Sequence, residues 1–203
     1  MSSEKSRAIV LRLVDFSESS CVVTLFTEQL GKIAALAKGA RRPKGPFESA
    51  LDVLAICRVV FLHKSSDTLD LLTEAKLETR FRASTRDLSR LYAGYYVAEL
   101  LNELTDIADP HPELFEEALS TLANLNADAD VLTTIVRFEL TTLRLLGHLP
   151  TWDQCAGCGE VVSRENRLAF GQLAGGVLCT TCRVGQREVV WVGGGLGVGR
   201  FYP

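Results

Sequence analysis

Short apolar runs and turn-forming residues alternate along the first part of the chain. The runs RAIVLRLV (residues 7–14) and CVVTLFT (21–27) are rich in Val, Leu and Thr, which favour β-strands. Gly31 lies in the polar stretch EQLGK and is followed by another apolar run, KIAALAKG. Because a turn at Gly31 would join two such runs, residues 21–37 are predicted to form a β-hairpin.

Two further strands are predicted before residue 82. The segment 51–64 is almost continuously apolar at its centre. The segment 69–81 alternates apolar and polar positions with the period of two that is typical of a half-buried strand. The N-terminal region thus contains about five strands separated by turn signals. A small closed β-barrel is the simplest arrangement, since closure leaves no exposed strand edge.

The pattern changes to helical spacing near residue 84. The segments 84–105, 109–125 and 128–150 place apolar residues three or four positions apart. Ser84 or Thr85 is expected to cap the first helix. We therefore predict an α+β protein in which three helices pack on the barrel. The apolar face expected for the first helix comprises Leu88, Leu91, Tyr92, Tyr95, Leu101 and Leu104.

Composition limits the classes of protein that fit this pattern. The chain has 203 residues, 47% of them hydrophobic and 23% charged, which is ordinary for a globular protein. It contains no apolar run of about 18 residues that could span a membrane, and MSSEKSRAIV has no signal-peptide hydrophobic stretch. We expect a soluble, cytosolic protein with no membrane partner, whose six cysteines are reduced, metal-bound or catalytic.

The net charge of −3 conceals an uneven distribution. Residues 1–90 carry +4, residues 91–150 carry −8 and residues 151–203 carry +1. The basic part contains the Gly- and Pro-rich loop KGARRPKGP (38–46), which we call the basic loop. Its charged residues are Lys38, Arg41, Arg42 and Lys44. These side chains are expected to stay exposed, either as a solvated loop or as a contact for a polyanion.

A second basic set falls where the barrel should join the helices. It consists of Arg80, Arg82, Arg86 and Arg90. Together with Lys32, which lies on the preceding strand, the two sets would form a positive track for a nucleic-acid backbone. Phe47, Phe61 and Phe81 either stack on bases or, as the simpler reading, lie in the core.

Four of the six cysteines have the spacing of a metal site. They form two C-x-x-C pairs, Cys155 with Cys158 and Cys179 with Cys182. Two such pairs supply the four thiolates that tetrahedral Zn²⁺ prefers, and no position remains for water or substrate. The alternatives are a redox dithiol or two disulfides. We predict structural zinc, with the segment between the pairs forming a short hairpin. Cys21 and Cys57 are expected to be buried, inert thiols.

No feature of the sequence predicts an enzyme. The three histidines lie in no recognisable catalytic motif, and the chain contains no Walker loop, H-E-x-x-H or G-x-S-x-G sequence. A zinc enzyme is disfavoured because all four metal positions are cysteine. We therefore expect a binding protein rather than a catalyst.

The N-terminal stretch AIVLRLVDFSESSCVVTLFTEQLGKIAALAKGARRPKGP resembles the RecO family of bacterial DNA repair and recombination mediators. The segments LFTEQLGK and AKGARRPKG are the most similar, and the order of barrel, helices and paired cysteines strengthens the resemblance. It covers roughly residues 7–184. The resemblance implies an OB-fold domain at residues 1–80, a helical domain at 81–150 and an inserted zinc-knuckle module at 151–203 that ends in a Gly-rich tail.

The resemblance also implies a function. Proteins of this family bind single- and double-stranded DNA, anneal complementary strands and, with RecR, help load the RecA recombinase onto DNA coated by single-strand DNA-binding protein. Their helical domain can engage the acidic C-terminal tail of that coating protein, and their place is the bacterial nucleoid. The implied DNA-contacting residues are Lys32, Lys38, Arg41, Arg42 and Lys44, and the implied Zn²⁺ ligands are the four paired cysteines.

Two points stay open at the level of sequence. Similar proteins continue with helical sequence after the second cysteine pair, whereas this chain ends in VVWVGGGLGVGRFYP, which is either a truncated or a divergent end. The second point is the class of function. A zinc-ribbon adaptor that mainly recruits protein partners is the alternative to a DNA-binding mediator.

Overall fold

The computed structural model describes residues 2–42, 45, 47, 50–63, 69–83, 87–127, 129–163 and 167–193. The chain forms two compact units, Met1–Thr142 and Leu143–Pro203. The barrel and most of the helical segment belong to the same unit. Lys44, Arg86, the expected cap residues Ser84 and Thr85, and the end of the Gly-rich tail all lie outside the described residues.

A closed five-stranded barrel opens the chain, as predicted. Its strands are β1 (Ser2–Asp15), β2 (Cys21–Thr27), β3 (Gly31–Ala37), β4 (Ile56–His63) and β5 (Asp70–Thr79). The order around the barrel is β1-β2-β3-β5-β4. The long β1 pairs with β4 through its first half and with β2 through its second, so one strand closes the barrel. The β3–β5 pair is parallel, whereas the other pairs are antiparallel.

The barrel interior is filled by apolar side chains that alternate along each strand. Ala8 and Val10 of β1 and Val23 and Leu25 of β2 are fully buried, as the two-residue period requires. The three phenylalanines considered for base stacking are buried instead. Phe47 and Phe61 belong to the barrel core cluster, and Phe81 lies where the barrel meets the helices. The core interpretation is therefore confirmed.

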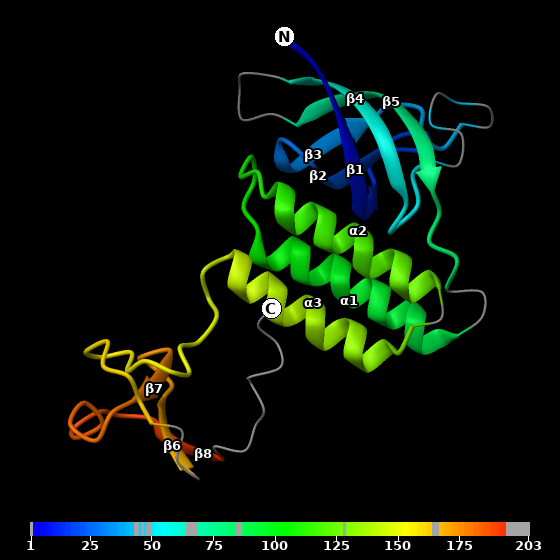
Figure 1. Cartoon of the computed structure of the whole chain (residues 1–203). Coiled ribbons are helices and arrows are strands. Elements are labelled where there is room, and N and C mark those ends of the chain that lie inside the picture. The colour runs from blue at the N-terminus through cyan, green and yellow to red at the C-terminus, as the bar shows by residue number, and fades with distance from the viewer. Residues whose placement is uncertain are drawn as a thin grey trace. The chain divides into compact units, whose positions relative to one another are not determined.

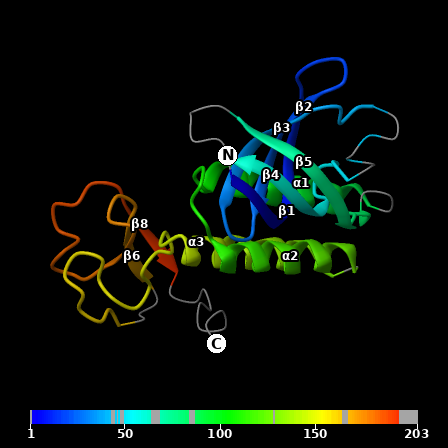
Figure 2. The same ribbon diagram turned by 90° about the horizontal axis from the view of Figure 1, so that it is seen from above.

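Three helices follow the barrel, close to the predicted segments. They are α1 (Leu88–Leu104), α2 (Pro112–Asn126) and α3 (Val131–Leu145). Figures 1 and 2 show α1 and α2 running side by side beneath the barrel. The cap of α1 is Asp87 rather than the predicted Ser84 or Thr85, and its carboxylate accepts a hydrogen bond from the Ser89 amide at 2.8 Å.

The buried face of α1 differs from the predicted one. Leu88 and Tyr92 are more than 60% exposed, and the residues turned inward are mostly small. The buried set is Ala93, Gly94, Val97, Ala98 and Leu101. A Cβ atom on Gly94 would lie 2.7 Å from Leu54 and 2.8 Å from the Phe81 ring. The helix approaches the barrel too closely for large side chains, so packing distance overrides the apolar pattern.

The second unit contains a three-stranded sheet and the paired cysteines. Its strands are β6 (Arg167–Gly171), β7 (Gly176–Leu178) and β8 (Val189–Gly193), in the order β7-β6-β8. Strands β6 and β7 form the hairpin predicted between the two C-x-x-C pairs. The pairing of β8 with β6 was not predicted, because its sequence lies in the Gly-rich end of the chain. Among the described residues, no helix is long and apolar enough to cross a membrane.

Candidate nucleic-acid interface and metal centre

The basic loop begins where β3 ends and is held against the turn between β1 and β2. The Arg41 amide donates to the Ser19 carbonyl at 3.1 Å, and the Gly39 amide donates to the Ser20 hydroxyl at 3.4 Å. The Arg41 guanidinium also contacts the Asp15 carboxylate at 2.8 Å. The start of the loop is thus fixed by backbone hydrogen bonds at one end of the barrel.

The described cations of the loop are exposed. Lys38 and Arg42 form no ion pair with any described residue, and the Arg41–Asp15 pair is open to solvent on both sides. An exposed pair of this kind contributes less than about 1 kcal/mol. A phosphate group could therefore replace Asp15 at little cost. The loop presents positive charge without a strong internal partner.

Lys32 does not lie with these cations. Its side chain is buried, and Nζ donates to the carbonyl oxygens of Asn102 and Thr105, both at 2.5 Å. These carbonyls lie at the C-terminal end of α1, where the helix dipole favours a positive charge. Lys32 therefore joins β3 to α1. A sequence pattern cannot show this, because the partners are backbone atoms 70 residues away.

The second basic set forms a small pocket where β5 leads into the helices. Arg80, Arg82 and Arg90 line a cavity of about 380 Å³ together with Asn126. The Asn126 side-chain oxygen accepts hydrogen bonds from the Arg82 and Ala83 amides at 2.9 and 3.0 Å. Arg90 donates to the Leu125 carbonyl at 3.0 Å, which ties α1 to α2. The structure thus brings three of the four arginines together, in a pocket whose described lining contains no residue of the basic loop.

A third group of cations was missed by sequence reasoning. Lys5, Arg7, Arg58 and Lys76 line a groove of about 940 Å³ on the outer face of β1, β4 and β5, which we call the barrel groove. The signal was present in part, because the outward positions of a strand are two residues apart, as in Lys5 and Arg7. The strand register that places Arg58 and Lys76 beside them was not available from the sequence.

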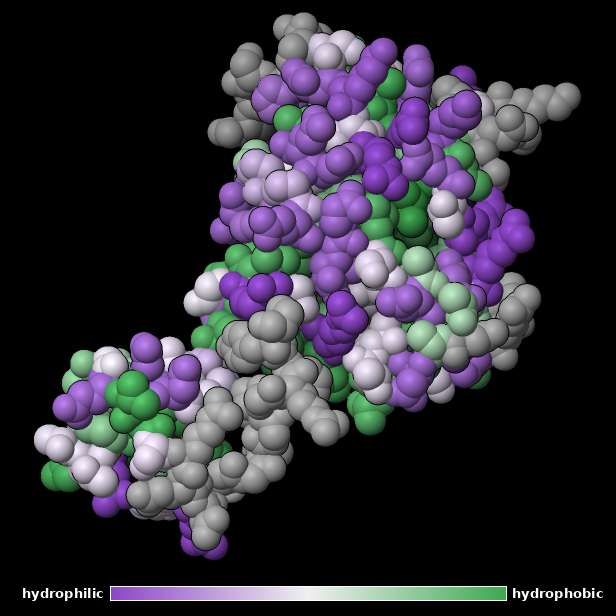
Figure 3. Space-filling model, viewed as in Figure 1, coloured by the Kyte–Doolittle hydropathy of each residue, from purple (hydrophilic) through white to green (hydrophobic). Residues whose placement is uncertain are grey.

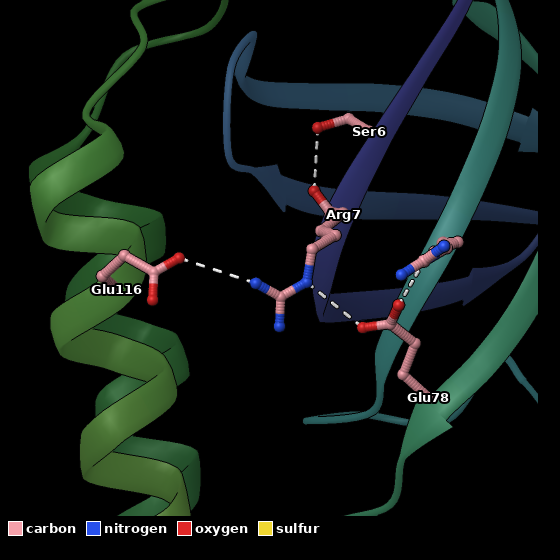
Figure 4. A network of polar contacts seen from close by, with 5 residues as sticks. Ser6, Arg7, Glu78 and Glu116 are labelled. Atoms are coloured by element: carbon pink, nitrogen blue, oxygen red, sulfur yellow. Dashed lines mark hydrogen bonds and ion pairs between the residues drawn. The ribbon is translucent and has the colours of Figure 1, made fainter.

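Arg7 and Glu78 connect the barrel groove to the helices. The Arg7 guanidinium lies between the carboxylates of Glu78 on β5 and Glu116 on α2, at 3.2 and 3.6 Å (Figure 4). Glu78 also accepts a hydrogen bond from Arg58. Partial burial raises the pKa of Glu78, but the hydrogen bonds from Arg58 and Arg7 outweigh it and leave the pKa below its usual value.

The four paired cysteines converge in the second unit. The sulfur atoms of Cys155, Cys158, Cys179 and Cys182 all lie within 4.8 Å of one another, and Cys158 Sγ is 3.8 Å from Cys179 Sγ. Gly159 adopts a φ of +77°, which a glycine tolerates, and its amide donates to the Cys155 carbonyl at 2.8 Å. This tight turn folds the first pair around a common centre.

The cluster has the chemistry of a tetrahedral thiolate site. Backbone amides stabilise the Cys155 thiolate, the Cys179 amide most strongly, and lower the pKa of Cys155 to about 6. The adjacent sulfur of Cys179 contributes most to raising the pKa of Cys182 to about 12, because crowded sulfurs disfavour a further negative charge. A cation removes that repulsion. Sulfur atoms bound at about 2.3 Å to one tetrahedral ion lie about 3.8 Å apart, so the cluster fits a metal ion.

The two remaining cysteines are not part of the four-cysteine cluster. Cys21 and Cys57 are buried in the barrel, as predicted. Burial raises the pKa of the Cys57 thiol to about 11, with a smaller contribution from the negative charge of Glu78. A thiol that holds its proton so strongly is a poor nucleophile.

These features define a class of protein: a closed β-barrel joined to helices, followed by a four-cysteine module. Comparison with known proteins gives the family. The family domain "Recombination protein O N terminal" matches residues 1–81, and "Recombination protein O C terminal" matches residues 85–194. The chain belongs to the RecO family of DNA repair proteins.

Curated relatives agree with this assignment. The DNA repair protein RecO of Rhodopirellula baltica is 51% identical over 184 residues, which cover 90% of this chain and 68% of the relative. The RecO proteins of Myxococcus xanthus and Halalkalibacterium halodurans are 37% and 35% identical. Those matches cover 91% and 88% of this chain and 75% and 68% of the relatives. The resemblance seen in the sequence is therefore confirmed.

Proposed function

We propose that this protein is a DNA repair and recombination mediator that binds single- and double-stranded DNA through an OB-fold. One observation carries the proposal. The basic loop presents Lys38, Arg41 and Arg42 to solvent at one end of a closed barrel. The closed five-stranded order, with β1 shared between two neighbours, supports an OB-fold, a barrel architecture that binds oligonucleotides. The loop neutralises phosphates, and no turnover is involved.

A triple variant of the basic loop tests the proposal. Replacing Lys38, Arg41 and Arg42 with alanine removes three phosphate contacts. Binding to single-stranded DNA should weaken by at least about tenfold at low salt, and the slope of log affinity against log salt should flatten by about 2. Gel-shift titrations of a labelled oligonucleotide at several salt concentrations measure both quantities.

A control with the same loss of charge separates local from general electrostatics. Arg137, Arg144 and Arg187 are exposed and lie outside the barrel, so their alanine triple variant changes the net charge equally. The control should retain most of the affinity. Equal losses in the two triple variants, or no loss in the loop variant, would remove the basic loop from the mechanism.

The wider activity follows from binding two strands. We propose that the protein anneals complementary strands and acts with RecR to load RecA on DNA coated by single-strand DNA-binding protein. The acidic tail of that coating protein would bind the helical part, residues 81–150. The test is annealing of complementary oligonucleotides with and without the coating protein. Annealing that the loop variant does not slow would contradict the proposal. The same DNA binding would place the protein on the nucleoid.

For the second unit we propose a structural Zn²⁺ held by Cys155, Cys158, Cys179 and Cys182. The ion would supply the positive charge that the crowded thiolates lack, and the closed ligand set leaves no position for a reacting group. This role needs no catalysis. Cobalt substitution should give a spectrum of four thiolate ligands, whereas a signature of bound water would favour a catalytic metal.

One observation favours a second candidate, the protein-recruiting adaptor. The four-cysteine module is a separate compact unit, and Val161, Val184 and Trp191 are among its exposed apolar side chains. An adaptor would bind partner proteins through this surface and would not bind DNA at low salt. Affinity capture combined with the gel shift distinguishes the two candidates.

A further inference from the structure

We propose that the barrel groove is a track for a nucleic-acid phosphate backbone, and that it links the basic loop to the arginine pocket at the barrel–helix junction. The inference rests on the proposed DNA binding and adds a second contact surface to it. The barrel groove lies on the outer side of β1, β4 and β5. In Figure 3, which has the viewpoint of Figure 1, hydrophilic side chains cover this part of the barrel.

Strand register sets three cations in one row. Arg7 on β1 lies opposite Arg58 on β4, and Arg58 lies opposite Lys76 on β5. Neighbouring strands are about 4.8 Å apart, so the row spans about 10 Å. A stacked strand carries one phosphate for each rise of about 3.4 Å along the helix axis, so about 10 Å of axis corresponds to about three phosphates. Lys5, two residues before Arg7, widens the row on β1.

The row is a poor arrangement for stability alone. Like charges directly opposite each other across a strand pair are destabilising. Glu78 offsets the charge of Arg7 and Arg58, whereas Lys5 and Lys76 form no ion pair with any described residue. A polyanion bound in the groove would supply the missing negative charge.

The lining of the groove comes next to residues of both predicted basic sets. Its lining includes Gly45 of the basic loop, whose amide donates to the Arg42 carbonyl at 3.1 Å. At the other side, Lys76 and Glu78 lie near the end of β5 and Arg80 directly follows the strand, and all three are exposed. Glu78 and Arg80 line the arginine pocket. A strand that contacts the loop can thus cross the groove and reach the junction.

Acidic side chains limit the positive charge of this track. Glu28 and Glu74 line the groove with the four cations. Glu78 accepts hydrogen bonds from the guanidinium group of Arg7 (Figure 4) and from that of Arg58. Neutralising Glu78 should release the Arg58 guanidinium toward a phosphate and leave Arg7 with Glu116 as its remaining carboxylate partner. Glu78 is therefore a residue that restrains DNA affinity.

The groove is tested with two variants that are expected to change DNA affinity in opposite directions. The first replaces Lys5, Arg58 and Lys76 with alanine and keeps Arg7, which packs on Phe115. The second is Glu78→Gln. The ligand is a single-stranded thymidine oligonucleotide of about 16 nucleotides, which is long enough for loop and groove together. Affinity is measured by fluorescence anisotropy across a salt series, with the triple variant of Arg137, Arg144 and Arg187 as control.

The triple groove variant should bind about tenfold more weakly, with a salt slope flatter by about 2. Glu78→Gln should bind several-fold more tightly, with a steeper slope. If the loop variant loses affinity while the groove variant binds like the unaltered protein, this inference fails and the proposed function stands. If neither loses affinity, the proposed DNA binding fails as well. A Glu78→Gln variant that binds no more tightly would also overturn the track.

Discussion

The barrel–helix unit and the four-cysteine module differ in what holds them together. The first unit encloses a core of fully buried side chains that includes Phe26, Phe61, Phe115 and Leu101. In the described part of the second unit, the buried apolar side chains are Cys155, Leu168, Ala169, Val177 and Leu178. In so small a unit the apolar core rarely supplies more than about 3–5 kcal/mol. Apolar packing therefore folds the first unit, whereas the second is expected to depend on a metal ion at its cysteine cluster.

Removal of metal should therefore have the largest effect, and only on the second unit. Chelation or Cys155→Ser should unfold the module, because apparent metal binding energies of about 10–16 kcal/mol are folding energy in small zinc domains. Both tryptophans, Trp152 and Trp191, lie in this unit, whereas Tyr92, Tyr95 and Tyr96 lie in the first. The emission of Trp152, which is partly buried and lies 5.2 Å from the Phe170 ring, should shift to that of an exposed indole, whereas Trp191 is already exposed.

The first unit serves as the internal control for metal removal. Its thermal unfolding, followed by far-ultraviolet circular dichroism of the helices, should keep its midpoint within a few degrees. A module that keeps its tryptophan emission after chelation would show that its small core suffices. Unfolding of both units together would show that the stability of the first unit also depends on the metal ion.

The next effect is expected at the contact between barrel and helices. Phe115 of α2 is fully buried, its ring lies 6.0 Å from that of Phe26 on β2, and the Arg7 guanidinium lies 5.9 Å from its ring centre. Phe115→Ala should lower the free energy of unfolding of the first unit by about 3–5 kcal/mol. Urea unfolding followed by circular dichroism measures the loss. Tryptophan emission of the module should not change, and a change would indicate that the units do not fold separately.

The sequence predicted elements better where the local pattern alone determines them. The strands of the barrel, the three helices and the hairpin between the cysteine pairs all follow from period, turn residues and spacing. The four-cysteine cluster was predicted completely, because two C-x-x-C pairs carry their geometry in their spacing. In contrast, the inward face of α1 was predicted wrongly except for Leu101, which is fully buried. Its small residues fit a close approach to Leu54 and Phe81, which no pattern within the helix reveals.

The charged residues show the same limit more clearly. Lys32, Lys38 and Arg42 look alike in sequence, yet Lys32 is bound to carbonyls at the end of α1 while the other two are exposed. The barrel groove was missed because its cations come from three strands whose register depends on barrel closure. Long-range placement, rather than residue type, decides which cations can meet a ligand.

Two lysine variants, one on β3 and one in the basic loop that follows it, test this difference in placement. Lys32→Met removes the charge that satisfies two buried carbonyls, and it should cost about 3 kcal/mol of unfolding free energy. Its matched control, Lys38→Met, alters an exposed side chain and should stay within about 0.5 kcal/mol. Urea unfolding gives both values. DNA affinity should show the reverse order, with the loss in Lys38→Met. Equal stability of the two variants would contradict a joining role for Lys32.

The smallest effect is expected from the pH dependence of Glu78. Burial raises the pKa of this carboxyl, but hydrogen bonds from Arg58 and Arg7 outweigh burial and hold the pKa below the ordinary value of 4.5 in the folded protein. The folded state therefore binds the proton less readily than the unfolded state. The resulting stability is present above about pH 4.5 and is lost as the pH falls through the lower folded pKa. For so exposed a group, the contribution should be under about 1 kcal/mol.

Urea unfolding of the first unit between about pH 6 and pH 3 compares the unaltered protein with Glu78→Gln. The two curves should converge as the pH falls, because the glutamine side chain of the variant mimics the protonated carboxyl and has no charge to lose. Glu139, which accepts a hydrogen bond from Tyr96 at the surface, provides the control, since Glu139→Gln leaves the barrel carboxylates in place. A gap between the Glu78→Gln and unaltered curves that stays constant with pH would show that Glu78 acts through packing. In that case the positions of the cations in the barrel groove would not depend on the negative charge of Glu78.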